Sequence, residues 1–207
     1  MFYWFVYVLL WLPFRLLYPI KVVGKKNVPK TKPVIYTCNH YTLKDPVLLA
    51  IFLNKRIRFL AKKELFSCFL SRWILKGLGA FPVDRGKADR KAMKFCLDTL
   101  QKKRILGIFP EGTRAKGADG TEEIDGVKDG AVMFALKTGA PIVPMAFEKP
   151  AKMFRRNKLF VGQALYFKPA IEGRPTKEEI HAATITLTEA LNALKQNNGL
   201  RVNERNM

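Results

Sequence analysis

Short apolar runs and longer amphipathic segments alternate along most of this 207-residue chain. The short runs are rich in β-branched and aromatic residues and are bounded by turn-forming residues, which is typical of buried strands. The predicted strands are 34–38, 57–61, 105–109 and 141–147, and the predicted helices are 46–54, 64–77, 87–103 and 128–138. This alternation predicts an α/β fold, a single domain with a mixed, largely buried sheet flanked by helices.

Two amphipathic segments show which face meets the core. In 87–103 small and apolar residues recur every four positions, at Ala88, Ala92, Cys96 and Leu100. A last helix is predicted from Thr176, because Glu179 stands three residues later, the spacing of a capping box. Its apolar stripe is Ile180, Ala183, Leu187, Leu191 and Leu194, and Gly199 suits its end.

The first 20 residues differ, because they contain eight aromatic side chains and a single charge, Arg15. The uncharged run before Arg15 is 14 residues, whereas crossing a bilayer takes roughly 20. Interfacial aromatics followed by lysines suit an anionic membrane surface. We therefore predict a monotopic membrane-anchoring helix or helical hairpin at 1–22, an α/β domain at 23–200 and a basic tail at 201–207. A core helix is the alternative, although it would normally show a polar face.

Charge is the outlying feature of the composition. The chain has 37 Lys+Arg and 17 Asp+Glu, a formal net charge of +20, which predicts attraction to nucleic acid, an anionic membrane or phosphorylated substrates. Nucleic-acid binding is disfavoured, because aromatics do not interleave with the basic residues as a stacking platform would. Three scattered cysteines and two histidines predict reduced thiols and no metal site.

The first candidate site follows the strand predicted at 34–38. Asn39 and His40 stand at its end, where functional groups gather in α/β folds, and Asp45-Pro46 opens the next helix. His40 could act as a general base, and Asp45 could accept its other N–H. Asp before Pro is also a common helix start, so N-capping alone could explain Asp45.

Two further clusters place an arginine at a turn. One is Glu111-Gly112-Thr113-Arg114 and the other contains Arg85. An arginine fork can hold phosphate bidentately, although each arginine could equally be a solvated turn residue or, at Arg85, pair with Asp84. The chain lacks the G-x-S-x-G and phosphate-loop motifs of other enzyme classes. A base without a protein nucleophile favours direct attack of a substrate hydroxyl on an activated acyl group.

Four motifs occur in a fixed order: Asn-His-x-x-x-x-Asp, Pro-Val-Asp-Arg, Phe-Pro-Glu-Gly-Thr-Arg and Ala-Pro-Ile-Val-Pro-Met-Ala. This order resembles the 1-acyl-sn-glycerol-3-phosphate acyltransferase family, over about residues 33–147. The resemblance implies that His40 is the base and Asp45 its orienting partner. It also implies a substrate site made of Asn39, Thr42, Arg85, Glu111, Gly112, Thr113 and Arg114, and an acyl pocket shaped by Pro144. Thr42 stands where the family usually has Ser, and Ala115-Lys116 follows where Arg-Ser is common.

The implied reaction moves an acyl group from acyl-CoA or acyl-carrier protein to the sn-2 hydroxyl of lysophosphatidate, giving phosphatidate. Another lysophospholipid or glycerol 3-phosphate is the alternative acceptor. No cofactor, no metal and no nucleic acid is expected, and the partners are membrane phospholipids and the two substrates. The expected location is the cell membrane, with the active site facing the cytoplasm. The apolar segment 65–75 is either a second membrane surface or an ordinary core helix.

Overall fold

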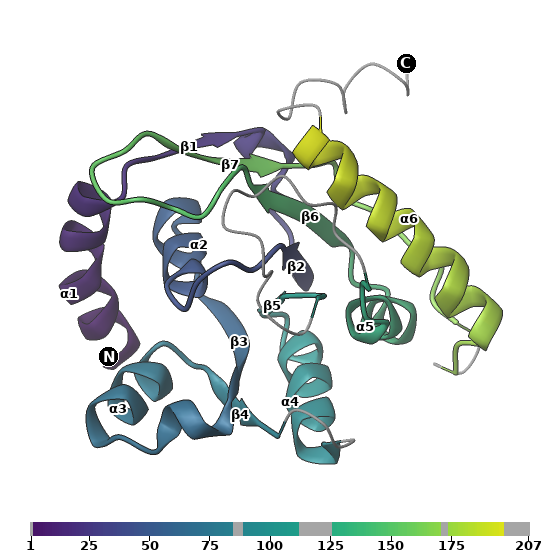
Figure 1. Ribbon diagram of the computed structural model, residues 1–207. Helices are drawn as coiled ribbons and strands as arrows, with labels where there is room; N and C mark the ends of the chain where they lie inside the picture. Colours follow the sequence, from purple (N-terminus) through teal and green to yellow (C-terminus); the bar gives the residue numbers. More distant parts are fainter. Residues whose placement is uncertain (1, 85–88, 112–125, 171–173, 197–207) are drawn as a thin grey trace.

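The computed structural model describes residues 2–84, 89–111, 126–170 and 174–196 (Figure 1). Its strands are β1 (Ile20–Val23), β2 (Val34–Cys38), β3 (Ile57–Lys62), β4 (Phe81–Val83), β5 (Ile105–Ile108), β6 (Ile142–Phe147) and β7 (Asn157–Val161). They form one seven-stranded sheet in the order β1-β7-β6-β2-β5-β3-β4. Every neighbouring pair is parallel except β6 and β7, which are antiparallel. The predicted single α/β domain with a mixed sheet is therefore confirmed.

The helices cover both faces of this sheet (Figure 1). They are α1 (Phe2–Leu17), α2 (Asp45–Leu53), α3 (Phe69–Gly77), α4 (Arg90–Gln101), α5 (Gly130–Thr138) and α6 (Lys177–Gln196), with short 3-10 turns at Lys25–Asn27 and Lys63–Phe66. Successive side chains of the central strand β2 point to opposite faces of the sheet, and both faces are buried. Tyr36 packs in the core under α1 and α2, and Ile35 packs in the core under α4, α5 and α6.

Three short strands were not predicted, and each has a physical reason. β1 and β7 each carry a lysine, which breaks the apolar run that marks a buried strand. β4 contains Pro82, and proline is confined to positions such as an edge strand because it cannot donate to the ladder. β4 is indeed the last strand of the sheet. Residues 20–22, predicted as part of the membrane anchor, belong to β1 and pair with β7.

The predicted helical patterns are largely confirmed. Ala92, Cys96 and Leu100 are buried on one face of α4, whereas Ala88 lies outside the described residues. The capping box at the start of α6 forms as expected: Glu179 N–H donates to Thr176 Oγ1 at 3.1 Å, and Thr176 N–H donates to the Glu179 carboxylate at 2.8 Å. The helix predicted at 64–77 is instead two pieces, the 3-10 turn at Lys63–Phe66 and α3.

Helix α1 is continuous through Pro13, so the chain forms a single helix here and no hairpin. One face is buried by Tyr3, Val6 and Tyr7, while the opposite face exposes Trp4, Phe5, Val8, Leu9, Leu12 and Leu16. At its start α1 contacts α3 through the rings of Phe5 and Trp73. Within the part of the chain that the structure describes, no helix is long and apolar enough to cross a bilayer.

Candidate active site

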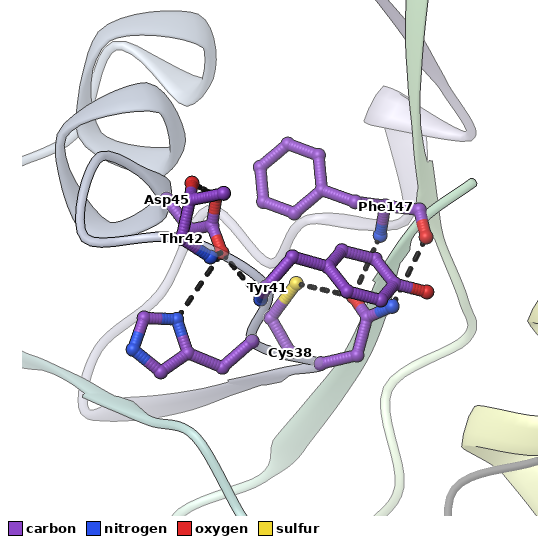
Figure 2. Close-up of polar contacts among 7 residues, drawn as sticks. Cys38, Tyr41, Thr42, Asp45 and Phe147 are labelled. Carbon is purple, nitrogen blue, oxygen red and sulfur yellow. Dashed lines mark hydrogen bonds and ion pairs between the residues drawn. The ribbon is translucent and has the colours of Figure 1, made fainter. Parts of the chain in front are cut away.

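The turn between β2 and α2 is organised around the carboxylate of Asp45, which is 1% exposed. Asp45 Oδ2 accepts hydrogen bonds from the backbone N–H groups of Tyr41 and Thr42, both at 2.7 Å, and lies 3.1 Å from His40 Nδ1. The Thr42 hydroxyl donates to the other oxygen, Oδ1 (Figure 2). A buried carboxylate needs such hydrogen-bond partners because burial removes its contact with water. The four contacts lock the turn and the imidazole together.

These contacts decide between the two interpretations of Asp45. Lys44 is the N-cap of α2 and makes no side-chain cap bond, while Asp45 is the first helical residue. The Asp45 carboxylate bonds backward to the turn and to His40, so helix N-capping does not account for its position. Pro46, which follows, has no N–H that would need a cap.

The two ring nitrogens of His40 differ: Nδ1 contacts Asp45, and Nε2 does not. Because Asp45 is a hydrogen-bond acceptor at Nδ1, the favoured tautomer carries its proton there and leaves a lone pair on Nε2. The ring also stacks on Phe109, with centroids 4.1 Å apart, and Phe109 stacks in turn on Phe59 at 5.6 Å. An imidazole held on one edge and on one face has few alternative orientations.

Asn39 joins the ends of two adjacent strands. Its side-chain amide donates to the carbonyl of Phe147 at 3.0 Å, and its side-chain oxygen accepts from the Phe147 N–H at 2.8 Å (Figure 2). The residue is 1% exposed. Both polar atoms of the Asn39 side chain are therefore hydrogen-bonded to the backbone of a residue 108 positions away in the sequence. In this arrangement Asn39 fixes the end of β2, and Thr42 orients Asp45; both act on the position of His40.

The remaining residues predicted for the site divide into described and undescribed ones. Glu111 lies just beyond β5; burial raises the pKa of its carboxyl, and a hydrogen bond from the His40 backbone opposes that rise. Its Oε1 is buried and, within the described residues, has no hydrogen-bond partner. Pro144 is buried in β6, where its ring would lie 3.0 Å from a Cβ placed at Gly162. Arg85, Gly112, Thr113 and Arg114 lie outside the described residues.

An apolar pocket opens beside the His40 ring. It is lined by His40, Leu43, Pro46, Leu60, Ala61, Lys62, Leu65, Leu75 and Phe109. A second pocket adjoins it through Leu43, Pro46, Leu60, Ala61 and Leu75, and extends to Tyr3 of α1. Pro144 lines neither of these two pockets. Together they form an apolar path from the imidazole to the N-terminal helix.

Most of these lining residues were missed by sequence reasoning, although one carried a usable signal. Phe109 stands directly before the Pro-Glu-Gly-Thr-Arg motif and at the end of a predicted strand, so its proximity to the site could have been inferred. Leu43, Ala61 and Leu75 come from three separate segments, and no local pattern connects them.

Comparison with known proteins shows which family the chain belongs to. The family described as Acyltransferase matches residues 19–148, more than half of the chain. A 1-acyl-sn-glycerol-3-phosphate acyltransferase of Bacillus subtilis is 34% identical over 185 residues, which are 85% of this chain and 88% of that protein. The chain belongs to the 1-acyl-sn-glycerol-3-phosphate acyltransferase family. The resemblance seen in the four sequence motifs is thereby confirmed, and the chain is an acyltransferase.

Two further matches, a relative and a solved structure, cover most of the chain. One named 1-acyl-sn-glycerol-3-phosphate acyltransferase from Borreliella burgdorferi is 32% identical over 147 residues, which are 68% of this chain and 56% of that protein. A crystal structure of the 1-acyl-sn-glycerophosphate (LPA) acyltransferase PlsC from Thermotoga maritima matches with a TM-score of 0.63 and 24% identity. It covers 86% of this chain and 72% of that one, and it supports the fold.

Proposed function

We propose that this acyltransferase moves an acyl group from a thioester donor, acyl-CoA or acyl-carrier protein, to the sn-2 hydroxyl of lysophosphatidate. The observation that carries the proposal is the His40–Asp45 pair at 3.1 Å beside an apolar pocket. The names of the relatives from Bacillus subtilis and Borreliella burgdorferi support the acceptor. The product is phosphatidate.

His40 acts as the general base. Its Nε2 takes the proton of the acceptor hydroxyl as that oxygen attacks the thioester carbonyl, and the Asp45 carboxylate stabilises the imidazolium that forms. The carbon–sulfur bond then breaks and the thiolate leaves. The Tyr41 and Thr42 N–H groups already donate to Asp45, so they orient the base and are not available to the oxyanion.

A covalent acyl-enzyme is not needed for this reaction. The nearest thiol, Cys38, is fully buried in the core behind the turn, and burial raises its pKa well above the usual value. A protonated, buried thiol is a poor nucleophile. Direct transfer between the two substrates is the simpler route.

The acceptor's phosphate is assigned to Arg85 and to the segment 111–114. Two arginine forks can hold a phosphate dianion, which converts a bimolecular encounter into a positioned one. Glu111 is the first residue of this segment, and its carboxyl accepts a hydrogen bond from the His40 backbone.

The acyl chain of the donor is assigned to the apolar path between His40 and Tyr3. Ala61 lines both pockets on that path. Ala61→Phe should lower kcat/KM for long-chain donors roughly tenfold, because it removes space for several methylene groups, and should affect short-chain donors less. The measurement is a series of acyl-CoA chain lengths, with Ala182→Phe on the exposed surface of α6 as the matched control. Equal losses at all chain lengths would remove Ala61 from the acyl site.

Membrane attachment is assigned to α1, with the start of α3 beside it. Trp4, Phe5 and Val8 of α1 are 56%, 61% and 67% exposed, and Phe69 of α3 is 80% exposed. Such a large exposed apolar surface is unfavourable in water and is typical of a membrane-binding face. With a net charge of +20, the protein should bind anionic membranes, and salt should weaken that binding. The cytoplasmic face is the proposed side.

The test of the proposed function is acyl transfer by the purified protein to a panel of acceptors with one labelled donor. Lysophosphatidate should give the highest kcat/KM, above lysophosphatidylcholine, lysophosphatidylglycerol and glycerol 3-phosphate. Arg114→Ala should raise the KM for lysophosphatidate more than for acceptors whose phosphate bears a second ester. Preference for another acceptor would replace lysophosphatidate in the proposal, and transfer to none of them would overturn it.

A further inference from the structure

The loop that joins β6 to β7 has an unusual surface. Residues 148–156 contain four basic side chains, Lys149, Lys152, Arg155 and Arg156, and one acidic side chain, Glu148, which pairs with Lys158 of β7. Between the basic residues stand Met153 and Phe154, which are 47% and 73% exposed. Two large apolar side chains that project from a positively charged loop have no role in the catalytic site described above.

This exposure is built into the fold, because hydrogen bonds hold the loop. The side-chain oxygen of Asn157 accepts from Lys152 N–H at 2.9 Å, and its amide donates to the carbonyls of Lys152 and Arg155 at 3.1 and 2.8 Å. The Phe154 N–H donates to the carbonyl of Leu17 at 2.7 Å. The loop is therefore tied both to itself and to the end of α1.

Phe154 also has a left-handed backbone, with φ +55°. Glycine and asparagine adopt this conformation readily, whereas an aromatic residue does so at a free-energy cost. An exposed phenylalanine in a strained conformation is doubly unfavourable in water. Strained residues of this kind cluster at functional sites, where the surrounding structure holds them in place.

The position of the loop indicates the partner. The Phe154 N–H is bonded to Leu17, the last residue of α1, and the residue before it, Leu16, is 66% exposed. In Figure 1 the green loop lies at the end of α1 away from the N-terminus. Met153 and Phe154 therefore stand on a loop that is bonded to the end of α1 where that helix exposes Leu16. The surrounding positive charge complements anionic lipid head groups. Apolar side chains such as Met153 and Phe154 suit the boundary between head groups and acyl chains.

We propose that this loop inserts Met153 and Phe154 into an anionic membrane surface and forms a second anchor at the end of α1. The proposal rests on the membrane attachment of α1 proposed above and extends it to a separate element. The membrane would then hold the protein at α1 and at the loop beside its end, so that the domain cannot rotate about the axis of α1.

Insertion can be measured at each element separately. The background is Cys68→Ser, because Cys68 is exposed whereas Cys38 and Cys96 are buried. In this background an environment-sensitive fluorophore is attached to one new cysteine at a time: Met153→Cys in the loop, Leu9→Cys on α1, or Ile185→Cys on the exposed surface of α6. Vesicles of phosphatidylcholine and phosphatidylglycerol should shift the emission to the blue at positions 153 and 9 and leave 185 unchanged. A shift at 9 without one at 153 overturns the loop anchor and leaves α1 attachment standing. No shift at either position overturns both.

A second variant separates lipid binding from structure. Phe154→Asn removes the apolar ring and suits the left-handed backbone, so Tm should stay unchanged or rise. Partitioning onto the same vesicles should fall roughly tenfold, and Phe154→Trp should restore it. Unchanged partitioning of Phe154→Asn would overturn the proposal, as would a loss that Phe154→Trp fails to restore.

Discussion

Replacement of His40 by alanine is expected to lower kcat/KM for acyl transfer by about a thousandfold or more, while the protein stays folded. The imidazole provides the only general base assigned to the reaction, and Asp45 orients it through Nδ1. The turn itself should survive, because Asp45 still accepts from the N–H groups of Tyr41 and Thr42. The variant therefore separates chemistry from folding.

The measurement is labelled acyl transfer to lysophosphatidate by purified protein, together with thermal unfolding and vesicle binding. His181 offers a matched control, because it is the other of the two histidines and is exposed on α6. His181→Ala should behave as wild type in all three assays. Substantial turnover by a folded His40→Ala protein would exclude His40 as the base.

Substitution of Gly107 by alanine is expected to destabilise the protein by about 3 kcal/mol or more. Gly107 lies in β5 and pairs with Tyr36 of β2 on one side and Phe59 of β3 on the other. A Cβ at this position would lie 2.2 Å from Phe59 Cε1 and 2.8 Å from Ile57 Cγ2. The Phe59 ring is closely packed in the core, so it cannot move away from such a Cβ unless its neighbours move too.

The same substitution should also lower activity, because Phe59 supports the Phe109 ring on which His40 stacks. Denaturant unfolding and kcat at a temperature where the variant is folded would measure the two effects. Gly130→Ala at the start of α5 is the control, since no atom within 4 Å would meet its Cβ, and it should be neutral or slightly stabilising. Equal stability of Gly107→Ala and wild type would contradict the close packing of β5 against Phe59.

The strands and helices that the sequence predicted are those with strong patterns. β2, β5 and β6 are continuous apolar runs, and α4 and α6 show clear apolar stripes. The His40–Asp45 pair was predictable because its members lie five residues apart across one turn, so local geometry brings them together. β1 and β4 escaped detection because three or four residues interrupted by Lys21 or Pro82 carry too little pattern.

Contacts between distant segments could not be predicted in the same way. The bonds of Asn39 to Phe147 depend on β2 and β6 being neighbours, which is known only once the strand order is known. The single chain of rings from His40 to Phe109 and Phe59 likewise needs three strands in register. Sequence spacing predicted the His40–Asp45 pair, and tertiary packing determines how firmly its two members are held.

The link between α1 and the sheet has a consequence for how the acceptor is found. Only Tyr18 and Pro19 separate α1 from β1, and the Pro19 carbonyl accepts from Asn157 N–H at 3.0 Å. Because this connection is short and is hydrogen-bonded to β7, we expect α1 and the sheet to move together. If α1 lies in the membrane as proposed, His40 stays at a constant height above it. Lysophosphatidate would then reach the enzyme by lateral diffusion, a search in two dimensions, without leaving the lipid phase.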